Sequence, residues 1–276
     1  MTGPTSRSRT SLLARIADAV ARALGHVILW AAVAFIAVPG LLVLLLSFSA
    51  DPYVQFPPSS FGFDQYEAFF TSRIWLDAMR LSLVIGLLTV ALSLVISVPA
   101  TFVVFRTRMP ARHALLVLGV AGILIPGAAY AVALYGLYSR MNLLGTVGGL
   151  VIAHSLLAVP MALLVLGSAI VRIPRDLELV AMTLGANRWQ AMAGITLRLL
   201  SPAVFAAGIM AFLTSFDEAV FVNFLGGVGL VTIPKAIFDS VRYGLDPTIT
   251  AIAGTLIALS AVLMGLRGLV ERRTTR

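Results

Sequence analysis

Cysteine does not occur in the chain, which excludes disulfides, thiolate catalysis and cysteine-ligated zinc or iron–sulfur sites. Charged residues are also scarce, at 12% of 276 residues, whereas an ordinary soluble domain carries about 25%. Apolar residues make up 59% of the chain and the mean hydropathy is +0.99. The composition therefore excludes a soluble domain and predicts an integral membrane protein.

Lysine occurs once, as Lys235, and it is not preceded by glycine. A phosphate-binding loop of the Walker type needs a Gly-Lys pair followed by Ser or Thr, so any ATP must be hydrolysed by another subunit. The glycine-rich segment 226–229 follows an apolar run instead of a strand, and we interpret it as a loop. We expect no catalytic residues, no cofactor and no metal site, because the histidines are widely scattered. These are His26, His113 and His154.

Six apolar runs are long enough to cross a bilayer, for which about 20 residues are needed. Each contains Gly or Pro, for example Pro126-Gly127, and we expect kinks rather than breaks because neighbouring helices can satisfy the freed backbone groups. The first run exceeds the apolar region of a cleaved signal, about 7–15 residues, so we expect it to be retained. The runs lie within 27–50, 81–105, 114–139, 141–171, 201–224 and 247–266.

Basic residues are distributed unevenly between the two sides that six spans define. Fifteen lie on the side of both termini and five on the other side. Since short cytoplasmic loops carry an excess of Lys and Arg, we expect both termini in the cytoplasm. The net charge of +8 then reflects orientation and not nucleic-acid binding. The fifteen are Arg7, Arg9, Arg15, Arg22, Arg106, Arg108, Arg112, Arg172, Arg175, Arg188, Arg198, Arg267, Arg272, Arg273 and Arg276.

The segment 172–200 is longer than a bundle turn of about 2–8 residues. Asp176 lies where an acid favours the start of a helix, Gly185 suits a left-handed helix end, and Asn187 suits the cap of a second helix. The pattern predicts a helix, a tight turn and a helix; a hairpin lying on the cytoplasmic leaflet would satisfy it equally. One apolar stripe of the first helix comprises Leu177, Val180, Ala181 and Leu184, at helical spacing.

The segment 179–186, Leu-Val-Ala-Met-Thr-Leu-Gly-Ala, followed by Ile-Thr-Leu at 195–197, resembles the "EAA…G…I-x-L-P" loop of permease subunits in bacterial ATP-binding-cassette (ABC) importers. In that family the loop is the coupling helix that docks on the ATPase subunit. The chain departs from the motif at Leu179, Val180 and Arg198, where the family has Glu, Ala and Pro. The resemblance implies an ATPase-coupling role for Leu177, Leu179, Val180, Ala181, Leu184, Gly185 and Ala186.

The likeness covers about 81–266 and includes Ser-Arg-Met-Asn-Leu-Leu-Gly at 139–145 and Phe-Leu-Thr-Ser-Phe-Asp-Glu at 212–218. These segments are similar to the second permease of spermidine/putrescine-type importers. The resemblance implies an all-α membrane protein of the bacterial inner membrane: a type I ABC importer permease-like bundle of six transmembrane helices with a cytoplasmic coupling helix.

The same resemblance implies the partners. They are a second permease subunit, two ATPase subunits that use ATP and Mg²⁺, and a periplasmic solute-binding protein. The solute is expected to be a polyamine such as spermidine or putrescine, with another organic amine, an amino-acid derivative or a phosphonate as alternatives. We expect a cytoplasmic segment at 1–26, a first span at 27–50, a periplasmic loop with short helices at 51–80, a permease core at 81–266 with its coupling loop at 172–200, and a basic cytoplasmic tail at 267–276.

Asp217 and Glu218 are the only acids within the apolar runs. An intramembrane charge needs water, a cation or a partner, so we expect at least one to face the translocation path and favour a cationic solute. The alternative is an anchor to Lys235, Arg242 or the other permease. A secondary transporter is the rival class, although such folds use internal repeats that are not evident here. A third class, the membrane anchor of a multi-subunit enzyme, would need cofactor ligands such as paired His or Cys within the spans, and the sequence lacks them.

Overall fold

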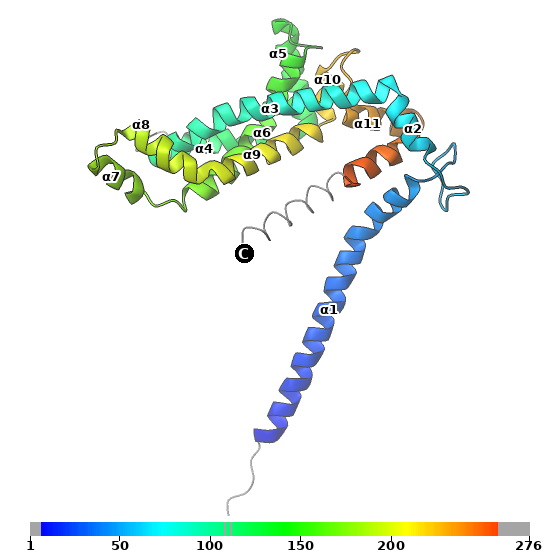
Figure 1. Cartoon of the computed structure of the whole chain (residues 1–276), viewed down its shortest axis with the longest axis horizontal. Coiled ribbons are helices and arrows are strands. Elements are labelled where there is room, and N and C mark those ends of the chain that lie inside the picture. Colours follow the sequence, from blue (N-terminus) through cyan, green and yellow to red (C-terminus); the bar gives the residue numbers. More distant parts are fainter. Residues whose placement is uncertain (1–6, 108, 111, 259–276) are drawn as a thin grey trace, which may run out of the picture. The chain divides into compact units, whose positions relative to one another are not determined.

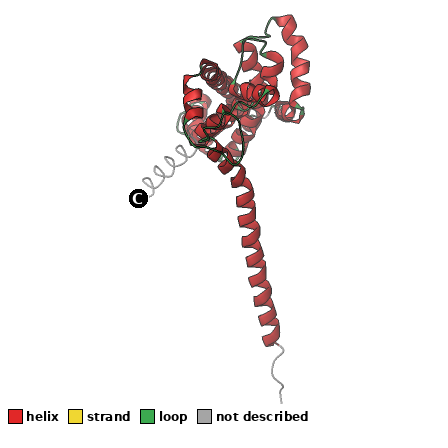
Figure 2. Ribbon diagram, turned by 90° about the vertical axis from the view of Figure 1, so that its right-hand side faces the viewer, coloured by secondary structure: helices red, strands yellow, loops and turns green. Residues whose placement is uncertain are grey.

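The computed structural model describes residues 7–107, 109–110 and 112–258, with side chains from residue 14 onward (Figure 1). The predicted all-α class is confirmed: the described residues form helices and loops without a strand (Figure 2). The labelled helices are α1 (Arg7–Leu46), α2 (Asp64–Thr71), α3 (Arg73–Arg106), α4 (Arg112–Ala121), η1 (Gly122–Leu124), α5 (Gly127–Met141), α6 (Val147–Ile170), α7 (Asp176–Thr183), α8 (Arg188–Ala191), η2 (Met192–Leu197), α9 (Arg198–Phe216), α10 (Val220–Leu225) and α11 (Ile233–Tyr243). A further helix, Thr248–Ala258, carries no label.

The chain divides into two compact units, residues 1–71 with 245–276 and residues 72–244. In the first unit, α1 is 40 residues long, or about 60 Å at about 1.5 Å per residue. The expected span over 27–50 is thus part of a longer helix that begins at Arg7 and ends at Leu46. The helix begins well before residue 27 because segment 7–26 is rich in Ala, Leu and Arg, which are strong helix formers.

The loop after α1 is organised around the buried side chain of Asp51. Its carboxylate accepts hydrogen bonds from Ser49 Oγ at 3.0 Å, from the Ser59 amide at 2.8 Å and from Ser60 Oγ at 3.2 Å. Gln65 Nε2 donates to the Asp51 carbonyl at 3.0 Å, which ties the loop to α2. Hydrogen bonds to the charged form, those of the Ser59 side chain foremost, hold the pKa of Asp51 below its ordinary value.

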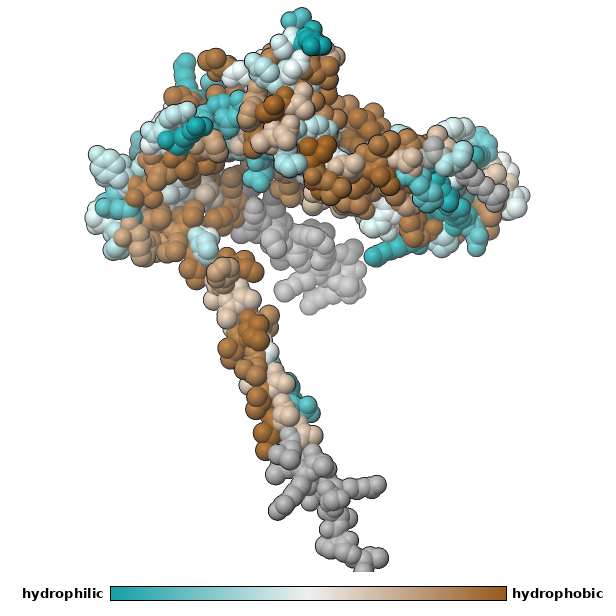
Figure 3. Space-filling model, turned by 180° about the vertical axis from the view of Figure 1, so that it is seen from behind, coloured by the Kyte–Doolittle hydropathy of each residue, from teal (hydrophilic) through white to brown (hydrophobic). Residues whose placement is uncertain are grey.

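The second unit is built on α3, α6 and α9, which pack side by side (Figure 1). Small residues let the helices approach closely, as is typical of membrane bundles. A Cβ on Gly86 would lie 2.8 Å from the Phe212 ring, and one on Gly167 would lie 2.9 Å from the Phe105 ring. Apolar residues are widespread on the surface seen in Figure 3, where they are brown. Fully buried alanines in this unit include Ala131, Ala153, Ala158, Ala162, Ala207 and Ala211.

Polar side chains also join the three helices inside the core. His154 on α6 is 1% exposed, and its Nδ1 lies 2.8 Å from Ser215 Oγ on α9. Ser215 Oγ in turn donates to Thr89 Oγ1 on α3 at 3.3 Å. His154 is therefore a packed polar group within its span.

Four helices of the described residues are long and apolar enough to cross a membrane, or five if one bent pair counts as a span. The expected sixth span begins as the apolar helix Thr248–Ala258, and its remainder, 259–266, lies outside the described residues. The basic tail expected at 267–276 lies outside them as well. The four long helices are Ala14–Leu46, Arg73–Arg106, Val147–Ile170 and Arg188–Phe216.

The expected third span, 114–139, is not one continuous helix. The segments Arg112–Leu124 and Gly127–Met141 meet at a bend of 107°, so the prediction of a mere kink at Pro126 is wrong. Proline has no amide hydrogen and disfavours a helical conformation in the residue before it. Accordingly Ile125 is extended, with ψ of 124°, and Pro126 itself has ψ of 130°. Prolines 39, 99, 160 and 202, in contrast, lie inside helices.

The fifth span also has different bounds from those expected within 201–224. Its helix runs without a break through Arg188–Phe216, including a π-helical stretch over Met192–Leu197. The second helix of the predicted hairpin is therefore the start of this span and not a separate element. At the other end the helix stops before Asp217, so the acids lie at a helix break and not within the span.

Candidate functional site

The first helix of the loop, α7, ends in a tight turn at Gly185. Gly185 has φ of +98°, a conformation that side chains with a Cβ rarely adopt. The Ala186 amide donates to the Ala181 carbonyl at 3.0 Å and the Gly185 amide to the Met182 carbonyl at 3.1 Å. This pair of bonds is the Schellman motif of helix ends. The predicted glycine-dependent turn is confirmed.

The second helix begins directly after the turn and is capped by Asn187, as predicted. Asn187 Oδ1 accepts from the Gln190 amide at 2.8 Å, and Gln190 Oε1 accepts from the Asn187 amide at 2.8 Å. This reciprocal arrangement is a capping box, which satisfies two amides that the helix leaves free. The two caps together fix the path of the chain between α7 and α8.

Apolar side chains of the hairpin face outward. Leu179, Val180 and Leu184 are 58%, 55% and 83% exposed, and Trp189 is 76% exposed. Leu177 is 40% exposed, and no residue of α7 is buried. Of the other residues in the predicted coupling set, Gly185 is exposed, and Ala181 and Ala186 are half-buried. The predicted set thus lies on α7 and the turn that follows it. Within the described residues, most of its apolar side chains are exposed.

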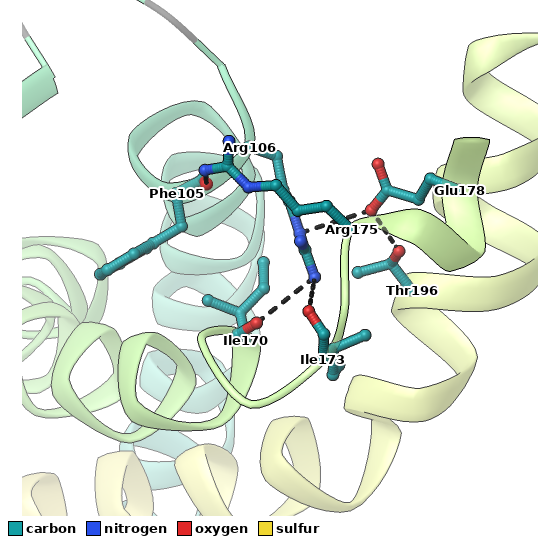
Figure 4. Close-up of polar contacts among 7 residues, drawn as sticks. All are labelled: Phe105, Arg106, Ile170, Ile173, Arg175, Glu178 and Thr196. Carbon is teal, nitrogen blue, oxygen red and sulfur yellow. Dashed lines mark hydrogen bonds and ion pairs between the residues drawn. The ribbon is translucent and has the colours of Figure 1, made fainter.

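Arg106, the last residue of α3, reaches from the end of its helix into the start of the loop (Figure 4). Its side chain is 4% exposed. Nη2 donates to the carbonyls of Ile173 at 2.8 Å and Ile170 at 3.3 Å, and Nε lies 3.4 Å from Glu178 Oε1 on α7. The guanidinium therefore joins α3 both to the end of α6 and to α7.

Two further contacts complete this cluster (Figure 4). Thr196 Oγ1 on η2 donates to Glu178 Oε1, and Arg175 Nη2 donates to the Phe105 carbonyl at the end of α3. We call Arg106, Arg175, Glu178 and Thr196 the polar anchor. Glu178 is not part of the predicted coupling set, since the motif position of Glu falls on Leu179. The available signals were an arginine that ends an apolar run and an acid that lies between two leucines in α7.

The two acids expected on the translocation path have different surroundings. Glu218 Oε1 accepts from the Phe221 amide at 2.9 Å and so caps the first turn of α10. Asp217 closes α9 and is exposed. Lys235 pairs with Asp239 within α11, and within the described part of the chain it forms no ion pair with either acid. The alternative in which Lys235 anchors the acids is therefore wrong.

The described residues thus form a helical bundle with membrane-length apolar helices and a capped hairpin between two of them, and the comparisons identify its kind. Residues 11–276 match the family described as "Binding-protein-dependent transport system inner membrane component". The chain belongs to this family. It is a permease subunit of an ABC importer of the inner membrane, and the family is one of transporters and not of catalytic enzymes. This membership decides against the secondary transporter and the enzyme anchor.

Relatives transport different solutes. The sulfoquinovosyl glycerol transport system permease protein SmoH of Agrobacterium fabrum is 30% identical over 206 residues, 72% of each chain. The spermidine/putrescine transport system permease protein PotC of Haemophilus influenzae is 25% identical over 240 residues, 87% of this chain and 93% of that protein. The trehalose transport system permease protein SugB of Mycobacterium tuberculosis is 25% identical over 210 residues, 75% of this chain and 77% of that protein.

Solved structures show the same fold. A chain of a bacterial ABC transporter involved in the import of the acidic polysaccharide alginate matches with a TM-score of 0.62 and 15% identity, over 98% of this chain and 99% of that one. The alginate transporter in complex with an alginate pentasaccharide-bound periplasmic protein matches with a TM-score of 0.65 and 17% identity, over 96% and 98%. The importer permease fold expected from the sequence is confirmed.

Proposed function

We propose that this chain forms half of the translocation path of an ATP-driven importer, together with a second permease. In this proposal two ATPase subunits bind ATP and Mg²⁺, and a solute-binding protein delivers the solute from outside. The observation that carries the proposal is the α7 hairpin, which presents exposed apolar residues on a turn fixed at both ends. Closure of the ATPase dimer then moves the hairpins, and rigid-body rotation of the bundles opens the path.

We propose that α7 docks on the ATPase mainly through apolar contact. Leu179 stands at the motif position of Glu and is exposed, whereas the neighbouring acid, Glu178, points inward to Arg106. Burial of apolar area contributes about 25 cal/mol per Å² and does not depend on charge pairing. Docking through these side chains should therefore be little affected by salt, unlike an interface held by exposed ion pairs.

Two matched variants test the docking. Leu184→Ser removes the most exposed leucine of the hairpin, and Leu213→Ser removes a leucine of α9 that is 53% exposed. The importer's ATPase subunit should co-purify with the wild-type chain and with Leu213→Ser but not with Leu184→Ser. Equal recovery of the ATPase with both variants would refute docking through α7.

We further propose that the solute is a small organic cation of the polyamine class. The support is Asp217, an exposed acid at the outer end of α9, and the similarity to PotC over most of both chains. Another organic amine, an amino-acid derivative or a phosphonate is the alternative, and a sugar derivative is a further one because SmoH and SugB are relatives. Binding of spermidine, putrescine, trehalose and a phosphonate to the importer's solute-binding protein distinguishes these solutes.

The orientation proposed for the chain places both termini and α7 in the cytoplasm. Its support is the excess of arginine on that side, fifteen of the 20 basic residues. The polar anchor and α7 then lie at the inner membrane surface, where an ATPase subunit can reach them. The break at Asp217 lies toward the periplasm, where a solute-binding protein would release its ligand.

A further inference from the structure

The helix α7 lies outside the apolar core of the bundle. No residue of α7 is buried, so the helix contributes no side chain to the apolar core. The apolar core cluster nearest the loop is instead built from α3, α6 and α9, through residues such as Phe102, Ile170 and Leu200. The capped turn joins α7 to the start of the fifth span, and this apolar cluster adds no contact of α7 with α3.

The polar anchor connects α7 to α3. Arg106 of α3 and Thr196 of η2 both contact the same oxygen of Glu178, Oε1. Arg175, one residue before α7, donates back to the carbonyl of Phe105 at the end of α3. The contacts thus run in both directions, from α3 into the loop and from the loop into α3 (Figure 4).

From these contacts we infer that Arg106, Glu178 and Arg175 are positioning residues that make α7 and α3 move as one rigid body when the ATPase subunits act on α7. The inference rests on the proposed function, because it assumes that the ATPase docks on α7. It also assigns different roles to different residues of the loop. Leu179 and Leu184 face the ATPase, and Glu178 faces the bundle and passes the displacement to the spans.

The burial of Arg106 makes its pairing with Glu178 costly to break. Its side chain is 4% exposed, and a guanidinium removed from water must keep its partners because an unpaired buried charge is strongly unfavourable. The planar group donates to carbonyls of Ile170 and Ile173 while it faces Glu178. A rotation of α7 alone would break the pairing with Glu178, so the anchor opposes independent movement of the helix.

The test measures the distance between α7 and α3 inside the assembled importer. Spin labels are placed at Thr183→Cys on α7 and Val95→Cys on α3, both exposed positions, in a chain with no cysteine of its own. The distance is recorded by pulsed electron paramagnetic resonance, with cysteines of the other subunits blocked, first without nucleotide and then with Mg-ATPγS. The comparison is made in the wild-type background, in Glu178→Gln and in Asp176→Asn.

Wild type should give a narrow distance distribution that Mg-ATPγS does not shift, because α7 and α3 move together. Glu178→Gln keeps the size of the side chain but removes the charge opposite Arg106, so the distribution should broaden. Nucleotide should then shift it by about 1–2 Å, the usual size of helix shifts at interfaces. Asp176→Asn removes an exposed acid from the same helix and should behave as wild type.

A second variant distinguishes loss of the ion pair from a general disturbance of the fold. Thr196→Val removes one hydroxyl from the anchor without leaving a charge unpaired, so its distribution should broaden less than that of Glu178→Gln. The inference is overturned if nucleotide shifts the wild-type distance as much as it shifts Glu178→Gln, or if Glu178→Gln gives the wild-type distribution. Failure of the wild-type chain to bind the ATPase would instead refute the proposed function, and the nucleotide-free distributions would still test the anchor.

Discussion

Replacing Gly185 should uncouple the ATPase while leaving the spans in place. The glycine has φ of +98°, and a Cβ built on it meets no atom within 4 Å. The cost of a substitution therefore comes from backbone strain alone, about 1–3 kcal/mol for a residue forced into a disfavoured region. A β-branched residue such as valine should lie toward the upper end of this range.

That cost converts directly into an expected loss of binding. If docking needs the Schellman turn, about 1–3 kcal/mol corresponds to about 5–150-fold weaker binding of the ATPase subunit by Gly185→Val. Gly185→Asn should lose less, since asparagine tolerates positive φ better than other residues. Gly136→Val on α5 serves as the control, because its Cβ also meets no atom within 4 Å and it carries no positive φ.

The assay is titration of the purified ATPase subunit onto the membrane-inserted chain, with uptake measured in parallel. Transport should fall together with ATPase affinity, and the variant should still insert into the membrane. If Gly185→Val binds the ATPase and supports uptake as well as wild type does, the turn does not position the docking surface and the reasoning is refuted.

Three further outcomes are expected. Single cysteines at Ser8 and Thr275 should be labelled only from the cytoplasm and one at Ser59 only from outside; labelling of Ser8 and Thr275 from opposite sides would exclude an even number of spans. Asp217→Asn should weaken uptake of spermidine by a cationic-solute importer without loss of assembly, and normal uptake would count against a cation path. Because the pKa of Asp51 is lowered in the folded loop, its stabilising contribution is present above about pH 4 and lost as the pH falls through the folded pKa. Asp51→Asn should therefore lower the thermal stability at pH 7 more than at pH 3, and an equal effect at both would contradict this assignment.

Local signals explain how much of the hairpin could be predicted. The turn at Gly185 and Asn187 is held by backbone and side-chain hydrogen bonds between residues at most five positions apart, and such bonds follow from residue type and spacing. The apolar runs likewise indicated where helices lie, since hydropathy is a property of each run alone. The long α3 and α6 and the class of fold followed from these local properties.

The polar anchor and the helix breaks depend on contacts that spacing does not reveal. Arg106 and Glu178 are far apart in the sequence and meet only because α3 and α7 are brought together by the packing of the spans. Pro126 resembles Pro160 as a residue type, but Pro160 is buried in the continuous helix α6 whereas Pro126 lies at the bend. The fifth span ends at Phe216 and Glu218 caps the next helix, a contact that hydropathy alone could not show.

Photocrosslinking from α7 tests most directly that this permease is coupled to an ATPase through its hairpin. A photoreactive amino acid at Leu184 in the assembled importer should form an adduct with the ATPase subunit, identified by mass spectrometry, whereas one at Leu213 should not. The yield at Leu184 should change on addition of Mg-ATPγS, since nucleotide is proposed to move the docked surface. An ATPase adduct at Leu213 and none at Leu184 would contradict the account.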